Sequence, residues 1–168
     1  CNNLVSLVRS ILADQKQFVE YSGHKSFVYD CPSGVVQGSN LGPLLFIIFI
    51  NDIVKSVSHD CKILLYADDL KIVKIVDNIK DCLILQRNID SVVDWCNVNR
   101  LFMNRDKCRI MTYSRKNCNI SFDYNMLNVS LKRCTEFKDL GLIMDTTLSF
   151  VCTLYVLLIR PCVRWVLL

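Results

Sequence analysis

The sequence lacks the cysteine and histidine spacing of a zinc-binding domain. Its ten cysteines include no Cys-x-x-Cys pair, and neither of its two histidines stands at ligand spacing from a cysteine. Zinc sites are built from such pairs, so a zinc site is disfavoured. No signal peptide precedes the cysteines, which argues against a disulfide framework. We interpret the cysteines as reduced, small apolar side chains of an intracellular protein, nuclear or cytoplasmic and not secreted.

The sequence also lacks an apolar run long enough to cross a membrane. The apolar run 44–53 is interrupted by Asn51 and Asp52, and residues 150–168 are interrupted by Arg160 and Pro161. A membrane-spanning helix needs about 20 predominantly apolar residues, so no membrane association is expected. Internal repeats are absent as well, and nothing in the sequence indicates an oligomeric state.

What the sequence does contain is enough apolar material for a folded domain. Of its 168 residues 52% are hydrophobic, so disorder is not expected. The net charge of +4 permits a polyanionic partner without requiring one. Residues 100–116 are rich in lysine and arginine, with Phe102 and Tyr113 among them. Such a segment suits a nucleic-acid backbone with stacked bases, but a solvated face beside core aromatics has the same composition.

The hydrophobic pattern predicts a chain of alternating helices and hairpins. Apolar spacing favours helices over residues 4–12, from Pro43 into the apolar run, and from an Asp77 or Asn78 cap to about Asn97. Strands are expected over 15–29 as a hairpin with a turn at residues 22–23, over 108–113, and over 120–124 paired with 128–131. Residues 137–145 are predicted to be one extended run with a glycine inside it.

The motif Tyr66-Ala67-Asp68-Asp69 lies between two β-prone runs and predicts a hairpin with two carboxylates at its tip. Two carboxylates at 4 Å repel each other by about 4 kcal/mol at an effective dielectric constant near 20. A shared cation removes that cost, and Mg²⁺ prefers carboxylate oxygens. A solvated acidic turn without a metal would show the same four residues.

Residues 34–43 form a glycine-containing loop that leads into the apolar run. Ser39 and Asn40 are favourable helix caps, and Pro43 suits a first helical turn. Backbone N–H groups at such a helix start can approach a nucleotide or phosphate. An ordinary connection between two elements would have the same composition.

The order of these motifs resembles the palm of a reverse transcriptase, and is most similar to that of non-LTR retrotransposons. The resemblance covers residues 4–150 and rests on four segments in the order of the family: Gln37–Asp52, Tyr66–Asp69, Trp95–Cys108 and Lys138–Gly141. It implies an α+β fold with a small antiparallel sheet and helices packed on one face. Residues 1–150 would then be a partial, incomplete palm domain, and residues 151–168 a divergent hydrophobic tail from a shifted reading frame or a run-on end.

The resemblance also assigns roles to single residues. It implies two Mg²⁺ ions that activate the primer 3′-oxygen and stabilise the pyrophosphate leaving group, with Asp68 and Asp69 as catalytic metal ligands. The other roles implied are contact with nucleotide and template, a basic residue near the active site, and a primer-grip turn. The residues that match them are Gln37, Gly38 and Ser39 for the first, Lys107 for the second, and Leu140 and Gly141 for the third. An RNA template, a DNA primer and deoxynucleoside triphosphates would be the partners.

The sequence departs from the family pattern in ways that affect activity. The first metal-binding carboxylate of the family belongs to an upstream strand that these residues do not contain, and Val36 stands where the family has proline. We therefore expect this chain alone to be inactive, and the Asp68 hairpin to have an uncovered neighbouring edge. The alternatives are a catalytically dead transposon relic that binds nucleic acid through residues 100–116, and an unrelated α+β interaction module.

Overall fold

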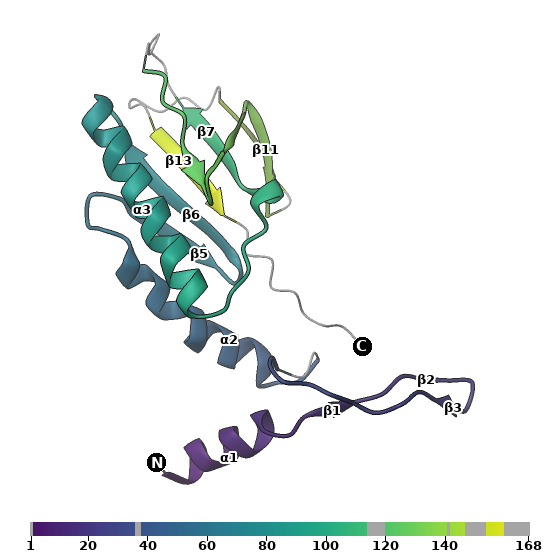
Figure 1. Cartoon of the computed structure of the whole chain (residues 1–168). Helices are drawn as coiled ribbons and strands as arrows, with labels where there is room; N and C mark the ends of the chain where they lie inside the picture. Colours follow the sequence, from purple (N-terminus) through teal and green to yellow (C-terminus); the bar gives the residue numbers. More distant parts are fainter. Residues whose placement is uncertain (1, 36–37, 114–119, 141, 147–153, 160–168) are drawn as a thin grey trace. The chain divides into compact units, whose positions relative to one another are not determined.

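The computed structural model describes residues 2–35, 38–113, 120–140, 142–146 and 154–159 of the chain. The described residues divide into two compact units, one within residues 2–49 and the other within residues 50–159. The two units are described separately (Figure 1). None of the helices in the described part of the chain is long and apolar enough to cross a bilayer.

The first unit contains two helices and two pairs of very short antiparallel strands. Strand β1 pairs with β4, and β2 pairs with β3 inside it, as the predicted hairpin over residues 15–29 requires. The Oγ of Ser39 accepts a hydrogen bond from the Gly42 N–H at 3.0 Å, so it caps α2 as its residue type predicts. The elements are α1 Asn2–Leu12, β1 Lys16–Gln17, β2 Glu20–Tyr21, β3 His24–Lys25, β4 Tyr29–Asp30 and α2 Gly42–Ile50.

The second unit contains a five-stranded sheet in the order β10-β7-β13-β6-β5, together with two separate hairpins, β8–β9 and β11–β12. All pairs in the sheet are antiparallel except β10 with β7, which are parallel and joined by a connection long enough for a crossover. Its elements are η1 Asn51–Ser56, β5 Lys62–Tyr66, β6 Asp69–Ile75, α3 Ile79–Val98, η2 Arg105–Lys107, β7 Arg109–Tyr113, β8 Asn125–Met126, β9 Val129–Ser130, β10 Lys132–Cys134, β11 Glu136–Asp139, β12 Leu142–Asp145 and β13 Leu154–Ile159.

Helix α3 packs against the sheet and contacts β6 (Figure 1). Its inward side is an apolar stripe with helical spacing, all buried: Cys82, Leu85, Ile89, Val92, Val93 and Cys96. On the strands Leu70, Ile72 and Ile110 are 0–1% exposed. This helix-on-sheet core is consistent with the α+β class.

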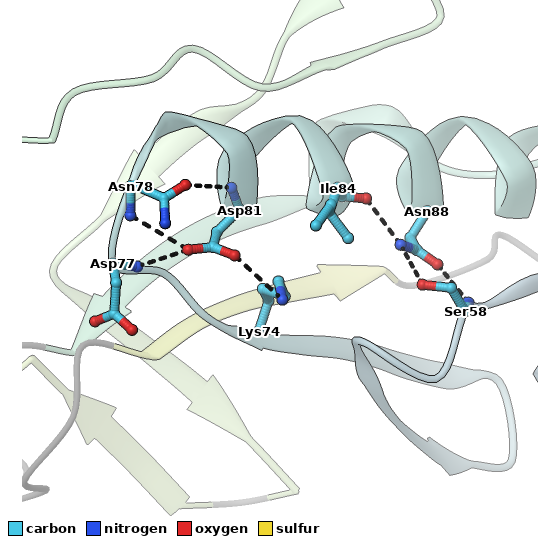
Figure 2. A network of polar contacts seen from close by, with 7 residues as sticks. All are labelled: Ser58, Lys74, Asp77, Asn78, Asp81, Ile84 and Asn88. Atoms are coloured by element: carbon cyan, nitrogen blue, oxygen red, sulfur yellow. Dashed lines mark hydrogen bonds and ion pairs between the residues drawn. The ribbon is translucent and has the colours of Figure 1, made fainter.

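Polar contacts fasten α3 to the β5–β6 hairpin at two points (Figure 2). At the start of the helix, Asn78 is the N-cap, and the Asp81 carboxylate accepts hydrogen bonds from the backbone N–H groups of Asp77 and Asn78. The Oδ1 atom of Asp81 also lies 3.5 Å from the Nζ atom of Lys74 on β6. Further along, the Asn88 amide, 4% exposed, exchanges hydrogen bonds with Ser58, just before β5. The helix is therefore held to the strand that begins at the two carboxylates.

The described cysteines are free thiols, and several belong to the core. Cys82, Cys96 and Cys108 are at most 2% exposed. Burial, with the neighbouring Cys108 as a smaller cause, raises the pKa of Cys96 to about 11, so this thiol is neutral at pH 7. These three cysteines act as small apolar side chains, as interpreted from the sequence.

Four expectations differ from the structure. Residues 137–145 are not one extended run, because β11 pairs with β12, with Asp139 opposite Leu142. The predicted pairing of 120–124 with 128–131 is replaced by the smaller β8–β9 hairpin. The edge of β6 is also not uncovered, because β13 pairs with it over six residues. The sheet is mixed rather than purely antiparallel, since β7 and β10 are parallel.

The Lys74–Asp81 pair gives a pH-dependent stability prediction. The hydrogen bond from the Asp77 N–H, and then the Lys74 cation, hold the pKa of Asp81 below its ordinary value of 3.8. A lowered folded-state pKa stabilises the fold above pH 3.8, and this stabilisation is lost as the pH falls through the folded-state pKa. A double-mutant cycle of Lys74→Ala and Asp81→Ala, measured by urea unfolding, should give a coupling of about 1 kcal/mol at pH 7 that vanishes at low pH.

The matched control is Asp94→Ala, which removes an exposed carboxylate from the same helix. It should show no coupling to Lys74. A Lys74–Asp81 coupling that stays constant as the pH falls well below 3.8 would contradict the assignment.

Candidate nucleotidyl-transfer site

Two carboxylates occupy the tip of the β5–β6 hairpin. We define this tip as residues Tyr66–Asp69. Tyr66 pairs with Asp69, so Ala67 and Asp68 form a two-residue turn. Ala67 has a φ of +50°, a left-handed conformation that two-residue hairpin turns require and that a side chain with a Cβ disfavours. Asp68 is exposed in the turn, and Asp69, partly buried, is the first residue of β6. The predicted hairpin is therefore present.

The alternation of β6 decides which face of the sheet carries Asp69. Leu70 and Ile72 are buried, and α3 packs against this strand. Successive side chains of a strand point to opposite faces, so Asp69 and Lys71 lie on the face away from α3. Further along that face, Val73 packs with the buried Met111 and Tyr113 of β7. We call the face that carries Asp69 and Lys71 the carboxylate face. Beyond the tip, apolar packing between β6 and β7 stabilises this face.

The register of the sheet brings a second basic element to the same end. Lys71 and Arg109 both pair with Leu158 of β13, so they lie level with each other on the two sides of this strand. Both β6 and β7 are antiparallel to β13, and they therefore run in the same direction. The first residues of β6 and β7 therefore lie at the same end of the sheet, which we call the carboxylate end. Lys107 of η2, just before β7, lies at this end as well. The two strands are about 10 Å apart there.

The donor set at the tip suits a hard divalent cation but is too small for two. Mg²⁺ takes carboxylate oxygens, which Asp68 and Asp69 supply. Within the described ranges, however, no three or more histidine, cysteine, aspartate or glutamate side chains are grouped as a metal site needs. Two neighbouring carboxylates alone do not hold a pair of ions in fixed geometry, so the tip supplies only part of the ligands that such a pair would need.

The other predicted site residues lie on separate elements. Gly38, with a φ of +78°, and Ser39 precede α2 in the first unit, where Ser39 lines a mainly apolar pocket with Ile11 and Val35. Leu140 has a φ of +46° in the turn between β11 and β12, which is consistent with the predicted turn. Gln37 and Gly141 lie outside the described residues.

The basic segment of the sequence is exposed near the carboxylate end. Arg105 and Lys107 are exposed on η2, and Phe102, 77% exposed, lies on the preceding connection. Arg100 is exposed as well, whereas Tyr113 is buried in β7 and is therefore a core residue. The basic residues 115–116 lie outside the described part of the chain.

Sequence reasoning missed Lys71 and Arg109, which share the carboxylate face. Their placement follows from the pairing of β13 with both β6 and β7. A signal for Lys71 was present, because period-2 alternation from Asp69 puts it on the same face. No local signal could place Arg109 beside it.

Comparison with known proteins bears on this site. The family model described as reverse transcriptase (RNA-dependent DNA polymerase) matches residues 3–144. The chain belongs to this family. The match includes the β5–β6 hairpin, α3, β7 and β10, and it confirms the family expected from the motifs. Reverse transcriptases generally use divalent metal ions, in accord with the carboxylates at the tip.

The curated relatives come from a mobile element. The chain is 29% identical over 155 residues to the RNA-directed DNA polymerase from mobile element jockey of Drosophila melanogaster. It is 28% identical over 157 residues to the polymerase of the same name from Drosophila funebris. In both cases 88% of this chain is covered, but the chain spans only 17% of the length of the relative. No solved structure is similar enough to count as a match.

The backbone of the tip gives a second prediction. Ala67→Gly removes the Cβ that disfavours a φ of +50° and should raise the free energy of unfolding by about 0.5–1 kcal/mol. Ala13→Gly is the matched control, because Ala13 is not among the residues with positive φ and should lose stability on the same change. Urea unfolding of both variants measures the difference. A loss of stability in Ala67→Gly would contradict the strained turn.

Proposed function

We propose that this chain is the palm portion of an RNA-directed DNA polymerase that carries two of its catalytic carboxylates. The observation that supports this most is the hairpin tip, where Asp68 stands in a strained two-residue turn and Asp69 begins β6, the strand that an ion pair holds to α3. Side chains on such an anchored element keep a fixed position, which phosphoryl chemistry requires. The family match and the relatives supply the reaction class.

The reaction would be nucleotidyl transfer onto a primer. The 3′-oxygen of the primer forms a bond to the α-phosphorus of a deoxynucleoside triphosphate, the bond to the bridging oxygen breaks, and pyrophosphate leaves. Divalent metal ions bound at the carboxylates would stabilise the charge on the attacking and leaving oxygens. Lys107, at the same end of the sheet, would add a cation near the leaving group.

The remaining predicted contacts belong to the same proposal. Gln37, Gly38 and Ser39 would contact the incoming nucleotide and template, since a capped helix start offers backbone N–H groups. Leu140 and Gly141 would form the primer-grip turn. An RNA template, a DNA primer and deoxynucleoside triphosphates would be the partners of the longer protein.

Primer extension tests the proposal in the longer protein that contains this chain. Asp68→Asn should lower Mg²⁺-dependent extension by about a thousandfold, or about 4 kcal/mol in the barrier, because a metal ligand is lost. Asp60→Asn removes an exposed carboxylate just before β5 and should leave extension unchanged.

The 168-residue chain alone should extend no primer, because two carboxylates do not hold both ions. Extension by this chain, abolished by Asp68→Ala, would overturn that expectation. Equal extension by the Asp68→Asn and Asp60→Asn forms of the longer protein would overturn the assignment of the site itself.

A second candidate function is binding of nucleic acid without catalysis, and the exposed cations with the exposed Phe102 favour it. Arg105→Gln and Lys107→Gln should each weaken binding of a single-stranded RNA and lower the slope of log affinity against log salt by about 1. Lys80→Gln, at the opposite end of β6 from the tip, is the control. Equal effects of all three substitutions in a filter-binding titration would mean non-specific attraction.

A further inference from the structure

The connection from α3 to β7 carries Lys107 and is held to the core at both of its ends. At the first end, the Leu101 N–H donates a hydrogen bond to the carbonyl oxygen of Cys96 at 2.8 Å, and the Cys96 side chain is only 2% exposed. At the second end, the Cys108 side chain is fully buried. We call the segment between these two anchors, residues 102–107, the basic loop.

Within the basic loop, Asn104 accepts hydrogen bonds from three consecutive residues. Its Oδ1 atom accepts a hydrogen bond from the Asp106 N–H at 3.1 Å, and its carbonyl oxygen accepts one from the Lys107 N–H at 3.1 Å. The same carbonyl oxygen accepts a hydrogen bond from the Cys108 thiol at 3.3 Å. Helix η2 is a single 3₁₀ turn, which has little stability of its own. Asn104 therefore organises the turn from which Lys107 projects.

Only one of these three contacts depends on which residue occupies position 104. Every residue offers the carbonyl oxygen, but only a short polar side chain can accept a hydrogen bond from the Asp106 N–H as an N-cap. Replacing such a cap by alanine shifts the equilibrium of the capped turn by about fivefold. The partly buried Asn104 side chain is thus the part of the support that a substitution can remove.

The support matters because lysine carries its charge on a long, flexible side chain. The fold can fix the backbone of Lys107, and the reach of the ammonium then depends on where the side chain begins. Arg109 and Lys71 are level on the two sides of β13, and β6 and β7 are about 10 Å apart there. Two residues before this level pair come Lys107 and Asp69. A shift of the η2 turn would therefore change the access of the ammonium to a phosphate bound at the carboxylates.

We propose that Asn104 is a positioning residue for Lys107. By capping the Asp106 N–H, the Asn104 side chain holds the η2 turn so that the Lys107 ammonium stays at the carboxylate end. Asn104 acts through Lys107 and does not itself contact the substrate. The inference rests on the proposed function, in which Lys107 adds a cation near the leaving pyrophosphate. The cap itself belongs to the fold, so it can be measured without catalysis.

Hydrogen exchange of the 168-residue chain tests the cap. Asn104→Ala should speed exchange of the Asp106 N–H by about fivefold or more, because its acceptor is lost, whereas Asn104→Ser keeps an acceptor and should exchange like the wild type. The matched control is Asn97→Ala, an exposed position near the end of α3, which should leave this exchange unchanged. The amides of β6 report global unfolding in each variant. Unchanged exchange of the Asp106 N–H in Asn104→Ala would overturn the proposal, whether or not the longer protein is a polymerase.

Primer extension by the longer protein, at saturating template and primer, tests the coupling to Lys107. Lys107→Gln should lower kcat by about a hundredfold, since a cation near the leaving group is lost. Asn104→Ala should lower kcat by up to about fivefold, and Asn104→Ser should restore it. In the Lys107→Gln background, Asn104→Ala should have no further effect, because the two residues then act as one unit.

Two kinetic outcomes would overturn the proposal. Independent, multiplicative losses in the double variant would mean that Asn104 only stabilises the fold. An unchanged kcat for Lys107→Gln would leave no cation for Asn104 to position. Asp68→Asn separates both outcomes from a failure of the polymerase assignment. If Asp68→Asn abolishes extension while either outcome is observed, the carboxylate site stands and the role of Asn104 falls.

Discussion

Backbone pairing along β6 is the constraint on which the second unit depends. This strand is paired on one edge by β5 and on the other by β13, while α3 packs against one of its faces. Because its N–H and C=O groups are paired on both edges, its side chains keep a strict alternation. That alternation buries Leu70 and Ile72 against α3 and leaves Asp69 and Lys71 on the other face. The position of the catalytic carboxylates in the proposed function is thus a consequence of strand pairing.

The features that could be predicted from the sequence are those set by near neighbours. The Asn78 cap, the apolar stripe of α3 and the two-residue turn at Ala67-Asp68 all depend on residues within a few positions of one another. The pairing of β11 with β12 was missed although it is local, because residues 137–145 were interpreted as one extended run with a bend inside it rather than as two strands. Such errors arise where one local amino-acid composition is compatible with two different backbone conformations.

The central strand could not be predicted, because its partners are distant in sequence. Residues 154–159 pair with residues about 45 and about 85 positions earlier, and no local pattern encodes such pairing. The continuous apolar run was interpreted as a divergent tail, yet this is the composition of a strand inside a sheet. The placement of Arg109 at the carboxylate end was missed for the same reason, since it exists only once β13 aligns β7 with β6. A position of Lys107 near the carboxylates was expected only from the family resemblance.

The shared neighbour also fixes the relative direction of β6 and β7. Both strands are antiparallel to β13 and therefore run the same way, so both begin at the carboxylate end. Strand β13 runs against them and ends there, with Ile159 opposite Leu70, the residue after Asp69. The uncharged end of β13 thus separates the start of β6 from the start of β7, and backbone pairing alone sets the distance of about 10 Å between the two strands.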